Sequence, residues 1–362
     1  MTRTGPQPTR GAIAIDARAA ARPELGGVER WARELVARLP VLRPGGYVVL
    51  EPPRGLAHRA GHAWEQLALP VRAARLGVRA LLCPANLAPL AFSRNVVIVH
   101  DAAALRHPGW YSPAYAEWQR LLLPAIARRA QLVITVSEFS SQELTELLNL
   151  PAERLAVVPG GVDERFSPHA DPGPARQALS LQRPYVLCVA SHTARKNLTA
   201  LVPAARALAG EGVDVVVAGG HRPQFAREAG LDALRLLGHV DDALLPGLIA
   251  GAAVFALPSR YEGFGLPVLE AMACGTPVVA AAAGALPETT GGAARLTEPD
   301  GDAFAAALTA LLRDRAERER LRAAGLARAR GFTWDATARA VDALLNGAGD
   351  APSSGTPPAP AS

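Results

Sequence analysis

The stretch AVFALPSRYEGFGLPVLEAMACGTPVVAA, residues 253–281, decides the fold. It consists of an apolar run (Ala253–Leu257), a glycine-rich loop, and a second apolar run (Pro277–Ala281). Pro267 suits the first turn of a helix between the runs, which we expect to extend to about Ala273. Runs that are apolar throughout are typical of parallel strands covered by helices on both faces. The stretch therefore predicts a strand–helix–strand unit of a parallel sheet.

The same alternation of apolar runs and helical patterns extends over most of the chain. A proline-dense stretch, residues 167–184, divides it into two series, as is typical of a connection between domains. We therefore expect an α/β protein of two Rossmann-like, doubly wound parallel-sheet domains facing a cleft. The other expected strands are Ala12–Ile15, Tyr47–Leu50, Ala80–Cys83, Asn95–His100, Leu132–Val136, Leu155–Val158, Tyr185–Ala190, Asp214–Ala218 and Leu234–Leu237.

This division gives expected boundaries. Residues 1–166 would form the first domain, 167–184 the linker and 185–330 the second domain. Residues 331–346 would form a last helix, and the Gly/Pro/Ala/Ser-rich residues 347–362 a disordered tail.

Two helices of the first domain carry clear signals. Apolar residues recur at helical spacing over Val28–Leu39. A further helix follows Val136, with Ser137 or Ser140 as its cap and Glu143 at capping-box spacing from Ser140.

Composition excludes several classes of protein. Hydrophobic residues make up 49% and charged residues 20% of the 362 residues, which excludes wholesale disorder. Three widely spaced cysteines exclude a disulfide framework and disfavour a cysteine metal cage. We find no leader-like apolar run and no uninterrupted apolar stretch of about 18 residues, so we expect a cytoplasmic protein.

Charge is distributed unevenly along the chain. Residues 1–165 hold 20 Arg and 14 acidic residues, whereas the remainder holds 18 basic and 19 acidic residues. The basic part favours an anionic partner such as a lipid surface or nucleic acid. The alternative is arginine scattered over solvated faces. Aromatic residues make up only 5%, and no stacking platform or known module is present, so we expect no nucleic-acid partner.

The glycine-rich loop and the helix after it predict a site for a diphosphate. A helix start presents free N–H groups to an anion, and Gly263 and Gly265 permit close approach. The loop follows a parallel strand, where open α/β sheets bind ligands. Glu262 and Glu270 flank this helix start, and a carboxylate there can accept hydrogen bonds from a vicinal diol such as a ribose. The alternative is that they are a cap carboxylate and a helix-face charge.

Two further sets of residues follow expected strands. Lys196, beside Arg195, is the only lysine among 38 basic residues, which indicates a position that needs a compact ammonium, as a diphosphate leaving group does. The alternative is a surface lysine. His100, beside Asp101, can bind a substrate hydroxyl or be a buried structural histidine.

Other catalytic motifs are absent. The sequence has no GxGxxG after the first strand, no P-loop lysine motif and no HExxH, which disfavours an NAD enzyme or an ATPase. Asp300-Gly301-Asp302 resembles a metal-binding DxD, but aspartates near a helix start commonly cap it. We therefore expect no metal and no cofactor.

Together, these motifs resemble those of glycosyltransferase family 4, a family of retaining enzymes with the GT-B fold. The resemblance runs from about Gly26 to Trp334. The Arg-Lys-Asn variant resembles the mannosyltransferase-like branch that builds bacterial polysaccharide. The motifs are Gly26–Arg30 (GGVER), His100-Asp101, Val133–Ser140 (VITVSEFS), Val158–Asp163 (VPGGVD), Arg195–Asn197 (RKN) and the Glu262/Glu270 pair.

The resemblance implies roles for these residues toward a nucleotide-diphosphate sugar. Glu270 would hold the ribose diol, Glu262 would contact the donor sugar, and Arg195 and Lys196 would neutralise the leaving diphosphate. His100 would touch the donor sugar or the acceptor hydroxyl. Residues that would contact the donor mainly through their backbone are Gly26 and Gly27 (diphosphate), Phe264, Gly265 and Leu266 (sugar and phosphates), and Gly238, His239 and Val240 (base).

The chain departs from the family pattern at two places. Many members have an arginine five residues before the diphosphate lysine, where this chain has Ser191. Before Gly161, where the family usually has an asparagine, this chain has Gly160. The implied activity is metal-independent transfer of a hexose to a glycan or lipid-linked acceptor in cell-envelope synthesis. Mannose is the hexose that the resemblance favours. A nucleotide-sugar epimerase of the same architecture and a scaffold without chemistry are the alternatives.

One segment of the first domain suggests contact with a membrane. Glu117–Ala130 can form one apolar side, made of Trp118, Leu121, Leu122 and Ile126, with Arg120, Arg128 and Arg129 near it. A second basic helix is expected to carry Arg72, Arg75 and Arg79. Such helices can lie on anionic lipid, here the inner face of the plasma membrane. The alternative is an ordinary amphipathic helix that faces the core, which the interruption expected at Pro124 favours.

Overall fold

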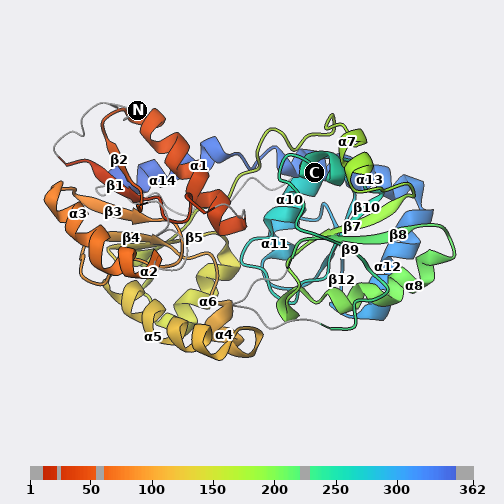
Figure 1. Ribbon diagram of the computed structural model, residues 1–362, viewed down its shortest axis with the longest axis horizontal. Coiled ribbons are helices and arrows are strands. Elements are labelled where there is room, and N and C mark those ends of the chain that lie inside the picture. The colour runs from red at the N-terminus through yellow and green to blue at the C-terminus, as the bar shows by residue number, and fades with distance from the viewer. Residues whose placement is uncertain (1–10, 23–25, 54–60, 221–228, 348–362) are drawn as a thin grey trace.

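The protein contains two parallel six-stranded sheets, each covered by helices (Figure 1). The computed structural model describes residues 11–22, 26–53, 61–220 and 229–347. The tail expected to be disordered lies outside the described residues, apart from Gly347.

The first sheet has the strand order β2-β1-β3-β4-β5-β6, and all its pairs are parallel. Alternate residues of its strands are buried on opposite faces, because side chains along a strand alternate. The strands are β1 Ile13–Asp16, β2 Tyr47–Leu50, β3 Ala80–Cys83, β4 Asn95–Ile98, β5 Leu132–Thr135 and β6 Leu155–Val157.

Helices cover both faces of this sheet (Figure 1). They are α1 Gly27–Leu42, α2 Gly61–Ala63, the π-helix η1 Trp64–Ala68, α3 Leu69–Arg75, α4 Ala103–Arg106, η2 Pro108–Trp110, α5 Pro113–Arg129, α6 Glu138–Leu148 and η3 Ala152–Arg154.

The second sheet has the strand order β12-β11-β10-β7-β8-β9 and is also parallel throughout. Its order reverses between β7 and β10, and a doubly wound sheet binds ligands at the carboxyl ends of the strands beside such a reversal. The strands are β7 Tyr185–Val189, β8 Asp214–Ala218, β9 Arg235–Gly238, β10 Val254–Leu257, β11 Val278–Ala281 and β12 Arg295–Thr297.

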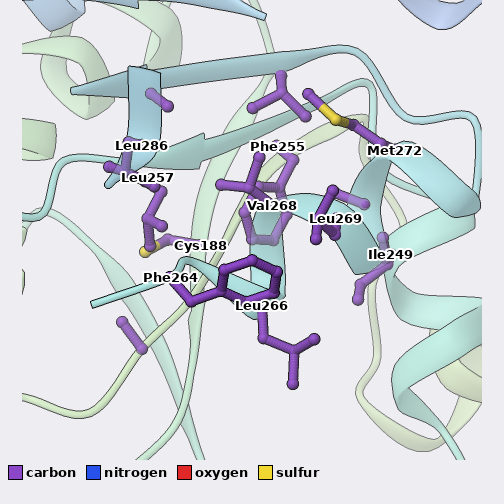
Figure 2. Packing of buried hydrophobic residues seen from close by; sticks show 14 of the residues in the cluster. Cys188, Ile249, Phe255, Leu257, Phe264, Leu266, Val268, Leu269, Met272 and Leu286 are labelled. Carbon is purple, nitrogen blue, oxygen red and sulfur yellow. The ribbon is translucent and has the colours of Figure 1, made fainter. Parts of the chain in front are cut away.

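Among the helices around this sheet, α10 is almost completely buried. Its apolar side chains Val268, Leu269 and Met272 pack with Ile249 and Phe255 in one hydrophobic cluster (Figure 2). The helices are α7 Gly173–Ala178, η4 Ala194–Lys196, η5 Leu198–Leu201, α8 Val202–Ala209, α9 Leu245–Ala250, α10 Leu266–Ala273, α11 Leu286–Thr290, α12 Gly301–Arg313 and α13 Arg315–Ala329.

The last helix, α14 (Trp334–Asn346), lies beside α1 of the first domain (Figure 1). Its Asp342 accepts a hydrogen bond from the Tyr47 hydroxyl at 2.6 Å and pairs with both Nε and Nη2 of Arg43. These contacts join the end of the chain to the first sheet.

The structure contains every strand that the sequence predicts, with ends displaced by at most two residues. It adds β12, whose Arg295 and Leu296 are exposed, so that no apolar run marks this strand. The stretch expected to be a linker, 167–184, contains α7, which packs against α9.

Two local expectations need correction. Ser137 alone is the cap of α6, because its hydroxyl accepts the N–H of Ser140, and Glu143 pairs with Arg106 rather than completing a capping box. Helix α5 continues through Pro124, and Leu123, Ile126 and Ala127 on either side of it are buried in the core.

Candidate active site

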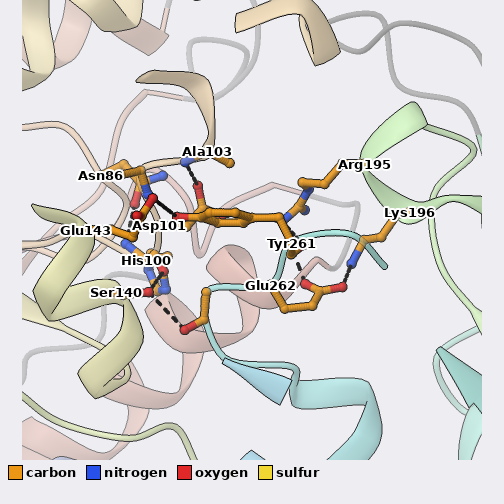
Figure 3. A network of polar contacts seen from close by, with 12 residues as sticks. Asn86, His100, Asp101, Ala103, Ser140, Glu143, Arg195, Lys196, Tyr261 and Glu262 are labelled. Carbon is orange, nitrogen blue, oxygen red and sulfur yellow. Dashed lines mark hydrogen bonds and ion pairs between the residues drawn. The ribbon is translucent and has the colours of Figure 1, made fainter. Parts of the chain in front are cut away.

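The residues singled out by sequence gather where the second sheet reverses its strand order. Arg195 and Lys196 lie in η4 after β7, and Glu262 lies in the loop after β10 (Figure 3). Both strands end at the same edge of the sheet, because they are parallel neighbours. His100 and Asp101 follow β4 of the first domain and face this edge (Figure 3).

A buried charge network occupies this edge. The Lys196 ammonium donates to Glu262 at 2.5 Å, and an Arg195 guanidinium nitrogen lies 3.6 Å from the same carboxylate. That nitrogen also lies 3.5 Å from Asp101, so that Arg195 bridges the two domains. A diphosphate at this position would meet one ammonium and one guanidinium, both already held in place.

Burial and charge pairing set the protonation of this network. Burial acts to raise the pKa of Glu262, but the adjacent Lys196 and Arg195 outweigh it and leave this pKa below its usual value. Burial lowers the pKa of Lys196, although Glu262 opposes this shift. Glu262 is therefore held as an anion between two cations.

The loop after Glu262 is pressed against the first domain. A Cβ on Gly263 would lie 2.1 Å from the carbonyl oxygen of His100, so only glycine fits. The hydroxyls of Ser137 and Ser140 both donate to the Gly263 carbonyl, at 2.6 and 3.0 Å. Gly265 caps α10 with φ of +94°, a conformation that favours glycine.

Phe264 and Leu266, the other predicted members of this loop, have buried side chains that pack into the core (Figure 2). Any contact with a ligand would therefore come from their backbone.

Glu270 lies one turn into α10, away from Glu262's cation pair. Its carboxylate is 3.5 Å from the guanidinium of Arg30, which comes from α1 of the first domain. Burial raises the pKa of Glu270 to about 7, and Arg30 opposes this rise. Arg30 also bonds Asp242 at 2.9 Å. Near neutral pH, Glu270 is therefore divided between its protonated and its ionised form.

His100 is buried with its ring edge against Trp31. Its Nε2 lies 2.8 Å from the carbonyl oxygen of Pro84, which can only accept, so this nitrogen carries the proton. Burial lowers the pKa of His100, which leaves Nδ1 as an acceptor in the neutral ring. A neutral imidazole of this tautomer can accept a hydrogen bond from a sugar hydroxyl.

The remaining predicted residues lie at element ends. Gly26 caps α1, its N–H donating to Glu29 at 3.0 Å, and Gly27 is exposed with open space where a Cβ would be. Val240 follows β9 with its side chain buried. Among the described residues, Gly27 therefore leaves room for a ligand, as approach to a phosphate would need.

Sequence reasoning missed several residues of this site. Tyr261, next to Glu262, is buried among aromatic rings of the first domain, including Phe139 at 5.2 Å and His107 at 5.9 Å between centroids. The motifs assign no separate role to Arg30, which ends the Gly26–Arg30 motif, and none to Asp242. No local signal marks Arg30, because Arg33 and Glu34, its neighbours on the same side of α1, are also charged.

Asp300 and Asp302 do not contribute to this network. Asp300 caps α12, its carboxylate accepting the N–H of Ala303 at 2.9 Å. Within the described ranges, no group of three or more His, Cys, Asp or Glu side chains is arranged to hold a metal ion. No helix within these ranges is both long and apolar enough to cross a bilayer.

Comparison with known structures shows the fold. Sucrose-phosphate synthase from Thermosynechococcus elongatus superposes with a TM-score of 0.73 at 23% identity, covering 94% of this chain and 99% of that one. HepE of Anabaena, solved in complex with UDP-glucose, gives a TM-score of 0.71 at 20% identity, covering 93% and 99%. The chain has the two-domain α/β architecture of GT-B glycosyltransferases.

Sequence comparisons assign the family. Residues 183–314 match the model described as glycosyl transferases group 1, and residues 80–166 match that of glycosyltransferase family 4. The O-antigen chain mannosyltransferase B of Escherichia coli is 33% identical over 261 residues, which cover 68% of each chain. With this identity over two thirds of both proteins and the family 4 match, the chain belongs to the glycosyltransferases of family 4.

Proposed function

We propose that this glycosyltransferase moves mannose, or another hexose, from a nucleoside-diphosphate sugar to a hydroxyl of a glycan or lipid-linked acceptor. The transfer would retain the anomeric configuration and serve the synthesis of a cell-envelope polysaccharide or glycolipid. The observation that carries the proposal is the Lys196–Glu262–Arg195 network at the reversal of strand order, where a donor diphosphate would lie.

The chemistry follows from the charges at this place. As the bond between the sugar C1 and the phosphate oxygen breaks, its electron pair passes to the diphosphate, and Lys196 and Arg195 stabilise the growing negative charge. The acceptor hydroxyl attacks C1 on the same face, and its proton passes to the departing phosphate oxygen. The products are the glycosylated acceptor and a nucleoside diphosphate.

A covalent sugar–enzyme intermediate is less well supported. It would need an unpaired carboxylate beside C1, but Asp101, Glu262 and Glu270 each lie within 3.6 Å of a cationic side chain. A carboxylate paired in this way is a weaker nucleophile. The pairing therefore favours attack on the same face as departure.

Mannose is the preferred sugar because the E. coli relative is described as a mannosyltransferase. The test is incubation with GDP-, UDP- and dTDP-sugars, with and without a mannan acceptor, followed by NMR of the anomeric proton in the product. A nucleotide-sugar epimerase would alter the donor and consume no acceptor. Absence of transfer from every donor would refute the proposed activity.

We also propose that the first domain contacts anionic membrane from the cytoplasmic side. On α5, Trp118 and Leu121 are 38% and 58% exposed, and on η1 Leu67 is 71% exposed. The other two residues of the expected apolar side, Ile126 and Leu122, pack against the core instead. The Trp118 ring lies 5.6 Å from that of His62 on α2, so α5 and α2 meet at Trp118. Arg128 and Arg129 are exposed at the end of α5 and would meet acidic head groups.

The second expected basic helix is shorter than the sequence suggested. Helix α3 ends at Arg75, because Gly77 follows with φ of +61°. Arg79 lies outside the helix, and its guanidinium donates to the carbonyl of Leu345 at 2.8 Å. Arg72 and Arg75 remain exposed on α3. The basic side chains of the membrane proposal are therefore these two arginines together with Arg128 and Arg129.

A further inference from the structure

Helix α6 of the first domain begins with two N–H groups that its own residues do not satisfy. A helix leaves its first N–H groups without partners inside the helix. The Ser137 hydroxyl accepts the N–H of Ser140, and the Ser137 carbonyl accepts that of Ser141. The N–H groups of Glu138 and Phe139 remain, and these need an acceptor from elsewhere.

The second domain supplies that acceptor. The two carboxylate oxygens of Glu288, on α11, accept the N–H groups of Glu138 and Phe139 at 2.9 and 3.0 Å. A carboxylate at a helix N-terminus is also attracted by the helix dipole. Glu288 is exposed, so water can replace this contact when the domains separate. The contact is therefore suited to repeated opening and closing.

Helix α11 is also tied to the loop that carries Glu262. The N–H of Ala285, at the start of α11, donates to the Glu262 carbonyl at 2.9 Å, and the Thr289 hydroxyl donates to the Phe264 carbonyl. A Cβ on Gly284 would lie 2.6 Å from the Glu262 nitrogen. A displacement of α11 would therefore displace the backbone of this loop.

The same end of α6 touches the loop directly, since Ser137 and Ser140 donate to the Gly263 carbonyl. We propose that Glu288 is a positioning residue that holds α6 against α11 and so couples closure of the two domains to the arrangement of the Glu262–Phe264 loop. This inference rests on the proposed function in one respect, namely that the loop binds the sugar donor.

The test compares Glu288→Ala and Glu288→Gln with wild type. Glutamine keeps the size of the side chain but only one acceptor, so it should show the smaller effect. Glu319→Gln, an exposed carboxylate on α13, is the matched control. Small-angle X-ray scattering of the ligand-free proteins should give a larger radius of gyration for Glu288→Ala and an unchanged one for the control.

With donor and acceptor, we expect kcat of Glu288→Ala to fall by about 2- to 30-fold, the range for a carboxylate at a helix N-terminus. The ratio of donor hydrolysis to sugar transfer should rise, because a less closed site admits water. A residue that served only stability would lower the melting temperature and leave this ratio unchanged, which would overturn the proposal.

The proposal would also be overturned if both variants had the radius of gyration and the kcat of the wild type. If Glu288→Ala fails to fold, the same readouts on Glu288→Gln decide the matter. If the wild type transfers no sugar, the proposed function fails, but the scattering comparison still tests whether Glu288 holds the domains together.

Discussion

The Lys196 ammonium lies 2.5 Å from a carboxylate oxygen of Glu262, although the two residues follow different strands. The pair is buried, with side-chain exposures of 10% and 7%. Glu262 thus holds the only lysine of the chain in place before a donor arrives. An ammonium fixed in advance needs little rearrangement to stabilise charge on a leaving diphosphate.

Lys196→Ala should therefore lower turnover more than donor binding, because leaving-group charge is largest in the transition state. We expect kcat to fall by about 10²–10³-fold, as for other preorganised electrostatic contacts. Steady-state kinetics at saturating donor measure this, with Arg315→Ala, at the exposed start of α13, as control. A wild-type kcat would contradict the role of Lys196.

Glu270→Ala should weaken binding of the free nucleoside diphosphate by about 1.5–3 kcal/mol, the value of hydrogen bonds to a charged group. Isothermal titration calorimetry measures this directly. Unchanged affinity would show that Glu270 does not hold the ribose.

Nucleotide binding should also depend on pH through Glu270. Its pKa is raised to about 7, and a carboxylate accepts from a diol best when ionised, so affinity should increase from pH 6 to pH 8. Glu270→Gln should have the flatter pH profile of the two proteins. If wild type and Glu270→Gln showed the same change of affinity with pH, a group other than Glu270 would cause the pH dependence.

Activity should survive removal of divalent ions, because Lys196 and Arg195 supply the positive charge that a metal would otherwise provide. The measurement is the transfer rate in EDTA, with and without added Mn²⁺ or Mg²⁺. Loss of activity in EDTA that either ion restores would revive a metal role for Asp300 and Asp302.

The full-length protein should sediment with anionic vesicles at low salt and less so at high salt. The double variant Arg128→Glu and Arg129→Glu should lose this binding, and Trp118→Ser should weaken it by removing apolar contact. Neutral vesicles and the Arg315→Glu variant are the controls. Absence of binding to anionic vesicles at low salt would end the membrane proposal.

Asp342→Ala should destabilise the protein by about 1–3 kcal/mol, because it leaves the buried Tyr47 hydroxyl without its acceptor. Hydrogen bonds from Arg43 lower the pKa of Asp342 below 3.8, so its contribution is present above that pH and is lost as pH falls through the folded-state pKa. Urea unfolding at pH 7 and pH 3 should show a smaller difference between variant and wild type at pH 3.

The amino-acid sequence alone was sufficient to predict every strand of the two sheets except β12, and the helix that begins after Gly265. These features leave local signals, because a strand covered on both faces must be apolar throughout and a helix start selects glycine and proline. The short edge strand β12 leaves no such signal, since Arg295 and Leu296 are exposed.

Only the tertiary structure decided which charges meet. Sequence placed Glu262 and Glu270 on one loop and helix, but it could not show that Lys196 pairs with the first and Arg30 with the second. The sequence around Glu288 and around the start of α6 likewise gives no sign that the two are in contact. Such pairs join distant parts of the chain through the packing of two domains, and periodicity along the chain reports burial but not the partner across an interface.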